Sequence, residues 1–202
     1  MRIFVFRIIN DLLSFKKFIN EEEFNLSLKK VSGLLLKKFI IKLYSNIDTK
    51  EIIIKKNQNS KPYFNDKIFF NISYSKEYVV GVSHDSEIGL DIEDFNNNIN
   101  KILYKYGNKN NINQNSYVEN TKIWTKIESL LKFIGIGLKG IDKIKIMDNN
   151  LITFSNKNNY IQTDITNKLP PNICGTITTN KKIKTINLFY INQKILINIL
   201  NK

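Results

Sequence analysis

The sequence is poor in cysteine and histidine, with one residue of each. Cys174 has no second cysteine to pair with, so the chain forms no internal disulfide, which suits a reducing cytoplasm. One cysteine and one histidine also argue against a structural zinc site. His84 stands between two expected strands, beside Asp85, and no nucleophile motif accompanies it. We therefore interpret His84 as a turn residue.

The sequence also lacks the long apolar run, about 18 residues, that a membrane-spanning helix needs, so we expect no membrane partner. Residues 1–9 are apolar, but Arg7 interrupts them and no small-residue cleavage site follows. We predict a first strand there, not a signal peptide. A glycine-rich phosphate loop is absent, and Gly135 with Gly137 is typical of a helix C-terminus.

The composition fits a globular protein with a strong positive charge. The chain has 202 residues, 42% of them hydrophobic and 11% aromatic, enough for one domain or two small halves. The formal net charge of +13 attracts polyanions, but the abundance of Lys, Asn and Ile is also typical of an AT-rich coding sequence. A basic nucleic-acid-binding protein is the alternative that charge alone supports. Because the aromatics are not interleaved with basic residues and no helix-turn-helix appears, we expect no nucleic-acid partner.

Hydrophobic patterning predicts a mixture of helices and strands. The longest helix is expected at residues 21–44 and a shorter one at 10–20. Residues 193–202 are compatible with a helix or a strand, and the Asn-rich residues 96–120 are expected to form a mobile loop. Strands are expected at 52–54, 69–73, 79–83, 88–92, 173–179 and 185–191, with a hairpin formed by 144–146 and 151–154.

One helix carries the first candidate site residues. Trp124, Ile127 and Leu131 recur at three- and four-residue spacing and form an apolar stripe. Glu128 and Lys132 are four residues apart, so they lie together at the edge of this stripe. Taken alone, such a pair is typical of a solvated helix surface and worth about 0.3–0.5 kcal/mol.

A strand upstream carries two further carboxylates. Asp91 and Glu93 are two residues apart, so their side chains face the same side of an extended chain. Two such groups repel each other unless a cation or a proton lies between them. Glu128 would complete an oxygen-ligand set suited to Mg²⁺. Taken alone, an Asp-x-Glu at a strand end is more typical of a polar strand edge, so the spacing makes a metal site of Asp91, Glu93 and Glu128 one of two alternatives.

Four stretches occur together in an order that resembles a known family. They are Lys61–Tyr63, Asn71–Ser75, Gly89–Glu93 and Trp124–Lys132. Their order and approximate spacing resemble those of the 4′-phosphopantetheinyl transferases of the surfactin-synthetase-activating type. The resemblance covers residues 60–138 well and the C-terminal strands hardly at all.

The resemblance implies an α+β fold of two similar halves, related by a pseudo-twofold axis, with the active site in the cleft between them. The halves would be residues 1–88 and 89–202, an architecture that allows a monomer. Coenzyme A would lie in the cleft, with Mg²⁺ between its pyrophosphate and the three carboxylates. A serine of an apo carrier protein would attack the phosphate bearing the pantetheine arm, and adenosine 3′,5′-bisphosphate would leave.

The resemblance also assigns roles to single residues. Lys132 would place a cation on the phosphate, and Glu128 would help to deprotonate the serine, directly or through water. Lys61 would contact the 3′-phosphate of coenzyme A, and the N-terminal basic contact would be Lys29 or Lys30. The phosphates would also be bound by Ser73 and Tyr74.

Two positions depart from the family pattern. Tyr74 stands where the family usually has His, and a phenol cannot become a cation near neutral pH. Ile127 stands where Lys is common, and Lys126 points elsewhere because one helix position is a turn of about 100°. A relative that binds coenzyme A or the carrier without turnover therefore stays open as an alternative.

Because carriers of this family are usually acidic, we expect lysines such as Lys37 and Lys38 to steer them.

Overall fold

The structure is a computed structural model that describes residues 1–59, 61–65, 68–95, 99, 103, 116–146, 152–155 and 159–202. The chain forms several helices together with strands that pair in small sheets, so the expected α+β class is confirmed. The chain divides into two compact units, which are described separately. Unit 1 comprises residues 1–57, 62–85 and 183–202, and unit 2 comprises 58–61 and 86–182. The pseudo-twofold relation between halves stays a prediction.

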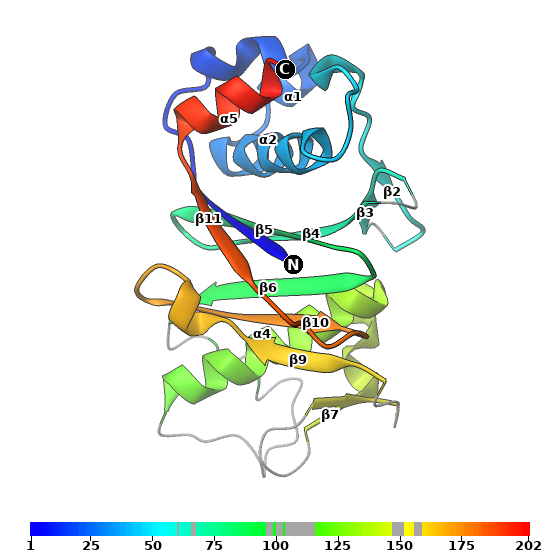
Figure 1. The fold of residues 1–202 in the computed structure, drawn as a ribbon. Coiled ribbons are helices and arrows are strands. Elements are labelled where there is room, and N and C mark those ends of the chain that lie inside the picture. The colour runs from blue at the N-terminus through cyan, green and yellow to red at the C-terminus, as the bar shows by residue number, and fades with distance from the viewer. Residues whose placement is uncertain are drawn as a thin grey trace. The chain divides into compact units, whose positions relative to one another are not determined.

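Unit 1 is built on a four-stranded sheet with the order β11-β1-β5-β4 (Figure 1). β5 is antiparallel to both β1 and β4, whereas β11 lies parallel to β1. Because of this parallel pairing, residues 183–202 belong to unit 1. The two units therefore do not follow the division into residues 1–88 and 89–202 that the resemblance implies. The strands are β1 (Arg2–Arg7), β4 (Phe69–Tyr74), β5 (Tyr78–His84) and β11 (Asn187–Ile191).

The long helix expected at 21–44 is divided in two, α1 (Glu21–Phe24) and α2 (Leu28–Lys42). The break falls where Ser27 leaves the helical conformation and its side chain accepts a hydrogen bond from the Lys30 amide. α2 packs on the sheet of unit 1, and α5 (Gln193–Leu200) packs on α2. The core contains Phe4, Phe6, Val31, Leu35, Leu36, Phe39, Ile40, Phe70 and Leu196.

The prediction of a strand at 52–54 is wrong. These residues lie between a 3-10 turn, η2 (Thr49–Glu51), and β2 (Lys55–Lys56), which pairs with β3 (Pro62–Tyr63). Ile52 is buried in the core, whereas Ile53 is 70% exposed, so the apolar run is not a paired strand. The short helix expected at 10–20 is a 3-10 helix, η1 (Leu13–Phe18), and His84 ends β5 instead of lying in a turn.

Unit 2 packs one helix on an antiparallel sheet of order β6-β10-β9. Gly135, with φ of 79°, ends the helix α4 as the sequence predicts. The expected hairpin is confirmed as β7 paired with β8, and its turn lies outside the described residues. The elements are β6 (Ile88–Asp94), α4 (Tyr117–Ile134), η4 (Gly137–Lys143), β7 (Ile144–Ile146), β8 (Ile152–Phe154), β9 (Ile161–Asp164), η6 (Thr166–Lys168) and β10 (Ile173–Thr179).

The loop expected at 96–120 is wrong at its end, because residues 117–120 form the first turn of α4. Nearly all of its other residues lie outside the described part of the chain. Across the described residues, no helix combines the length and the apolar character that crossing a membrane requires.

The two faces of β6 differ in chemistry. Ile88, Leu90 and Ile92 are fully buried on one face. The other face carries the alternate residues from Gly89 to Glu93, and α4 lies against it (Figure 1). α4 therefore packs on the polar side of the sheet, which places its own polar residues next to the carboxylates of β6.

Candidate active site

The centre of the candidate site is an ion-pair cluster between β6 and α4. The ammonium of Lys132 lies 2.6 Å from Oδ1 of Asp91 and 3.7 Å from Oε2 of Glu128. The Asp91 side chain is 2% exposed, whereas that of Lys132 is 29% exposed. A lysine on the helix thus bridges the carboxylates of both motifs, and part of its side chain is exposed to solvent.

The carboxylates of this cluster are short of positive charge. Burial, followed by repulsion from Asp91 and Glu128, raises the pKa of Glu93 from 4.5 to about 8. Burial and repulsion from Asp91 likewise raise the pKa of Glu128 to about 7, although Lys132 acts in the opposite direction. Burial lowers the pKa of Lys132, but attraction to Asp91 and Glu128 outweighs it and raises the pKa overall. One ammonium therefore does not balance three carboxylates.

The three carboxylates predicted to bind a metal all belong to this cluster. In the described part of the chain, no three His, Cys, Asp or Glu residues are spaced to hold one metal ion as they stand. Lys132 lies between Asp91 and Glu128 in this arrangement. Whether Asp91, Glu93 and Glu128 bind Mg²⁺ stays a prediction.

Two neighbours of the cluster were given no role in the site by the sequence prediction. Trp124 on α4 favours the charged form of Glu93 and so opposes part of the rise in its pKa. Cys174 lies opposite Glu93 on β10, and burial raises its pKa to about 12 despite a hydrogen bond with Thr125. Cys174 is therefore a thiol at neutral pH and no nucleophile.

Contacts of α4 with the sheet fix the helix that carries Glu128 and Lys132. A Cβ added at Gly89 would lie 2.0 Å from the Ser129 carbonyl oxygen, so only glycine lets β6 approach the helix this closely. Thr125 and Ser129 form hydrogen bonds with Thr176 and Thr178 of β10. The alternation of Thr176 and Thr178 around Ile177 is the sequence signal that could have indicated a polar face there.

Lys61, the predicted ligand of the 3′-phosphate, lies in unit 2. Its ammonium is 2.5 Å from Oε2 of Glu87 and 3.3 Å from the carbonyl oxygen of Phe133, near the end of α4. The side chain is 13% exposed. Lys61 thus stabilises the C-terminal turn of α4, and its contact with a nucleotide stays a prediction.

The other predicted ligands lie in unit 1. Lys29 is exposed on α2, and its ammonium lies 5.6 Å from the centre of the Tyr74 ring. The Tyr74 ring packs on α2, where a Cβ added at Gly33 would lie 1.9 Å from its hydroxyl oxygen. Burial raises the pKa of Tyr74. Ser73 is buried and, as the neighbour of Tyr74 in β4, faces the other side of the sheet. Contact of these side chains with one ligand stays a prediction.

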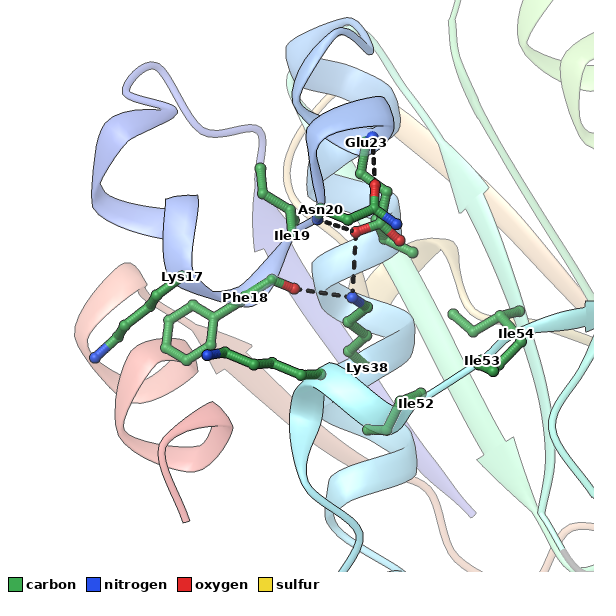
Figure 2. A pocket seen from close by; sticks show the side chains of 11 residues that line it. Lys17, Phe18, Ile19, Asn20, Glu23, Lys38, Ile52, Ile53 and Ile54 are labelled. Carbon is green, nitrogen blue, oxygen red and sulfur yellow. Dashed lines mark hydrogen bonds and ion pairs between the residues drawn. The ribbon is translucent and has the colours of Figure 1, made fainter.

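Lys38 has a structural role, so the expectation that it steers a partner is wrong. Its ammonium is 2.8 Å from the Phe18 carbonyl oxygen and 3.3 Å from Oε2 of Glu23, and its side chain is 5% exposed. These groups lie in a pocket of about 450 Å³ between η1, α1 and residues 52–54 (Figure 2). Lys37 is half-buried, and burial followed by repulsion from Lys56 lowers its pKa.

Comparison with known proteins supports the family resemblance. The chain is 33% identical over 132 residues to 4′-phosphopantetheinyl transferase gsp of Aneurinibacillus migulanus. The aligned part is 62% of this chain and 54% of that protein, so the chain spans about half the length of this curated relative. No protein-family model matches the chain. The resemblance to the 4′-phosphopantetheinyl transferases that the motifs indicate is thereby confirmed.

Proposed function

We propose that this chain is a 4′-phosphopantetheinyl transferase that acts on coenzyme A and the serine of an apo carrier protein. The observation that carries the proposal is the bridge of Lys132 between Asp91 and Glu128. This bridge joins two motifs that are distant in the sequence into one charged cluster. The 33% identity with a protein named as such a transferase supports the same function.

In the proposed reaction, the serine hydroxyl oxygen attacks the phosphorus atom that carries the pantetheine arm. A new phosphorus–oxygen bond forms, the bond to the second phosphate breaks, and adenosine 3′,5′-bisphosphate leaves. The serine proton passes to Glu128 or to water.

Lys132 supplies positive charge to the phosphate in this proposal. Phosphoryl transfer depends mainly on positioning and on neutralising charge, rather than on covalent help from the protein. The ammonium of Lys132 is tied to Asp91 on one side, and 29% of the Lys132 side chain is exposed, so the lysine is not sealed from solvent. Fixed cations of this kind act where charge develops in the transition state.

The residues of the cluster fit a divalent cation in their chemistry. Asp91, Glu93 and Glu128 offer the carboxylate oxygens that Mg²⁺ prefers. The raised pKa values of Glu93 and Glu128 indicate negative charge that Lys132 alone does not balance. We propose that these three residues hold Mg²⁺, which would act as a Lewis acid on the pyrophosphate.

The coenzyme A ligands are proposed to be Lys29, Lys61, Ser73 and Tyr74. Lys29 is exposed and free of carboxylate partners among the ion pairs described. Tyr74 can offer its hydroxyl hydrogen to a phosphate but no charge, so Lys29 beside it would supply that charge. The carrier is proposed to be acidic, and the transferase to act as a monomer.

The test is to mix the protein with coenzyme A, MgCl₂ and a purified apo carrier protein, and to weigh the intact carrier by mass spectrometry. We expect the carrier to gain the mass of one phosphopantetheine arm. Glu128→Gln should remove this gain, because it deletes one carboxylate at nearly constant shape. Glu119→Gln is the matched control, since Glu119 lies on the same helix but pairs with Lys122.

Two other outcomes would overturn the proposal. Calorimetric binding of coenzyme A without any mass gain, for fatty-acid, polyketide and peptide-synthetase carriers alike, would favour the relative that binds without turnover. Tight binding of duplex DNA at physiological salt, again without mass gain, would favour the nucleic-acid-binding alternative.

A further inference from the structure

We propose that two hydroxyl pairs, Thr125–Thr176 and Ser129–Thr178, set the position of α4 along β10. They would thereby place Glu128 and Lys132 against Asp91. The four hydroxyl residues are positioning residues, because none of them belongs to the ion-pair cluster itself. The catalytic consequence rests on the proposed function, whereas the positioning of the helix can be tested without it.

The two pairs form a short ladder. The hydroxyl oxygens are 2.9 Å apart in Thr125–Thr176 and 2.8 Å apart in Ser129–Thr178. All four residues are 2% exposed or less. Four residues on a helix rise about 6 Å, and two residues on a strand span about 6.7 Å. The spacing of hydroxyls on α4 therefore matches the spacing on β10, and both pairs form at a single position of the helix.

The hydroxyl hydrogens on the helix side are already in use. Thr125 donates to the Lys122 carbonyl oxygen at 2.9 Å, and Ser129 donates to the Lys126 carbonyl oxygen at 3.0 Å. In each pair the β10 threonine must then be the donor and the helix hydroxyl the acceptor. Sliding α4 along β10 would leave buried donors without acceptors, and an unsatisfied buried donor costs more than a made hydrogen bond gains over water.

An apolar contact would not hold the helix in the same way. Hydrophobic burial is non-directional, and buried hydroxyls without partners are costly. Ile177, between the two threonines, is fully buried on the opposite face, which shows that apolar residues are accommodated in this strand. The threonine hydroxyls on the face of β10 that meets α4 are therefore not needed to bury that face. Their effect is to specify one position of α4 along β10.

The ladder is directly linked to the ion-pair cluster. Thr176 is the partner of Asp91 in the register of β10 and β6. Glu128 precedes Ser129 in α4, and Lys132 follows Glu128 by one turn. Gln162 of β9 adds a third hydrogen bond between the sheet and α4, since its amide donates to the Lys126 carbonyl oxygen at 2.7 Å. A shift of α4 would thus separate Lys132 from Asp91, and a misplacement of about 1 Å can cost on the order of 10²-fold in rate.

The experiment compares three variants of single buried threonines. Thr176→Val removes a hydroxyl of the ladder at constant shape, and Thr176→Ser keeps the hydroxyl. Thr121→Val is the matched control, because Thr121 is fully buried on α4 and donates to the Tyr117 carbonyl oxygen within the helix. The measurements are kcat and KM for coenzyme A with an apo carrier, and the fluorescence of Trp124, the chain's single tryptophan.

We expect Thr176→Val to lower kcat on the order of ten-fold or more, with KM for coenzyme A within about two-fold of its original value. Thr176→Ser should restore kcat, and Thr121→Val should leave it unchanged. The emission of Trp124, which precedes Thr125 on α4, should change in Thr176→Val and not in Thr176→Ser. Thr125→Val combined with Thr176→Val should be no slower than Thr176→Val alone, because the pair acts as a unit.

Ser129→Ala tests the second pair if Thr176→Val does not fold. Unchanged kcat and unchanged Trp124 emission in the folded ladder variants would overturn the proposal, as would an equal loss in Thr121→Val. If the original protein modifies no carrier, the proposed function fails, and the Trp124 emission still decides whether the ladder positions α4.

Discussion

The ammonium of Lys132 lies 2.6 Å from Oδ1 of Asp91, a residue 41 positions earlier in the chain and almost completely buried. The sequence had paired Lys132 with Glu128 of its own helix, at a distance of 3.7 Å in the structure. The shorter contact with Asp91 makes Lys132 part of the packing of α4 on β6. Lys132 therefore has a structural and a proposed catalytic role.

The first prediction separates these two roles. Lys132→Ala should lower the free energy of unfolding by about 3 kcal/mol, because it leaves Asp91 buried without its ammonium partner. It should also lower turnover on the order of 10²-fold or more. Lys122→Ala, which breaks a half-buried pair with Glu119 on the same helix, should cost under about 1 kcal/mol and leave turnover unchanged. Urea denaturation and carrier modification measure the two effects, and normal turnover in Lys132→Ala would rule out the catalytic role.

The second prediction concerns pH in the absence of divalent cations. Glu93 and Glu128 have pKa values raised from 4.5 to about 8 and about 7 in the folded chain. Between pH 5 and pH 8 the folded chain therefore binds more protons than the unfolded chain, so stability falls as pH rises. We expect the free energy of unfolding to fall on the order of a few kcal/mol across this pH range, as measured by denaturation in the presence of EDTA. Glu93→Gln should flatten the profile, and a stability that rises from pH 5 to pH 8 would contradict the assignment.

The pH dependence also gives a test of metal binding. A divalent cation that binds the ionised carboxylates competes with protons for them. MgCl₂ should therefore raise the melting temperature more at pH 8 than at pH 5, and the difference should disappear in Asp91→Asn. CaCl₂ and an equal ionic strength of NaCl serve as controls for specificity and for screening.

The third prediction concerns the contact of Tyr74 with Gly33. Gly33→Ala should cost about 1–3 kcal/mol, because the new Cβ would lie 1.9 Å from the Tyr74 hydroxyl oxygen. In a Tyr74→Ala background, the same change should stabilise the chain by up to about 1 kcal/mol, since alanine favours a helix interior over glycine. Urea denaturation of the original chain, the two single variants and the double variant measures this change of sign in the effect of Gly33→Ala on the free energy of unfolding. Equal effects of Gly33→Ala in both backgrounds would show that Tyr74 does not pack there.

The fourth prediction concerns steering of an acidic carrier. Lys38 is buried with Glu23, so charge reversal there would unfold the chain rather than report on encounter. Lys55 and Lys56 are exposed on β2, Lys56 is close enough to Lys37 to lower its pKa, and neither is a proposed coenzyme A ligand, so this pair suits the test. Reversal of both to Glu should lower kcat/KM for the carrier more than reversal of Lys181 and Lys182 does. The difference should shrink with salt, as the Debye length falls below about 8 Å. Equal losses at both sites would favour compositional drift as the origin of the net charge of +13.

The sequence predicted the candidate site where short-range periodicity decides the structure. Asp91 and Glu93 alternate with buried residues on β6, and Glu128 and Lys132 lie one turn apart on α4. Gly135 ends that helix as expected. Each of these features depends on neighbours within about four positions, and such patterns are local.

What the sequence did not predict depends on partners that are distant in the chain. Lys61 is bound by Glu87 and the Phe133 carbonyl oxygen, and the spacing of residues does not reveal such contacts. The break at Ser27 was missed because side-chain capping overrode an apolar period that continues across it. Ile52 to Ile54 have strand propensity but pair with none of the strands that the structure describes, so tertiary context decided their conformation.

The parallel pairing of β11 with β1 has a consequence for synthesis of the chain. β1 pairs with β11, a strand that follows the whole of unit 2 in the sequence. The sheet of unit 1 therefore cannot be completed before residues 86–182 have been synthesised. Unit 2 can fold while β1 still lacks this partner, and until β11 is available the apolar residues of β1 depend on the other strands of the sheet or on chaperones.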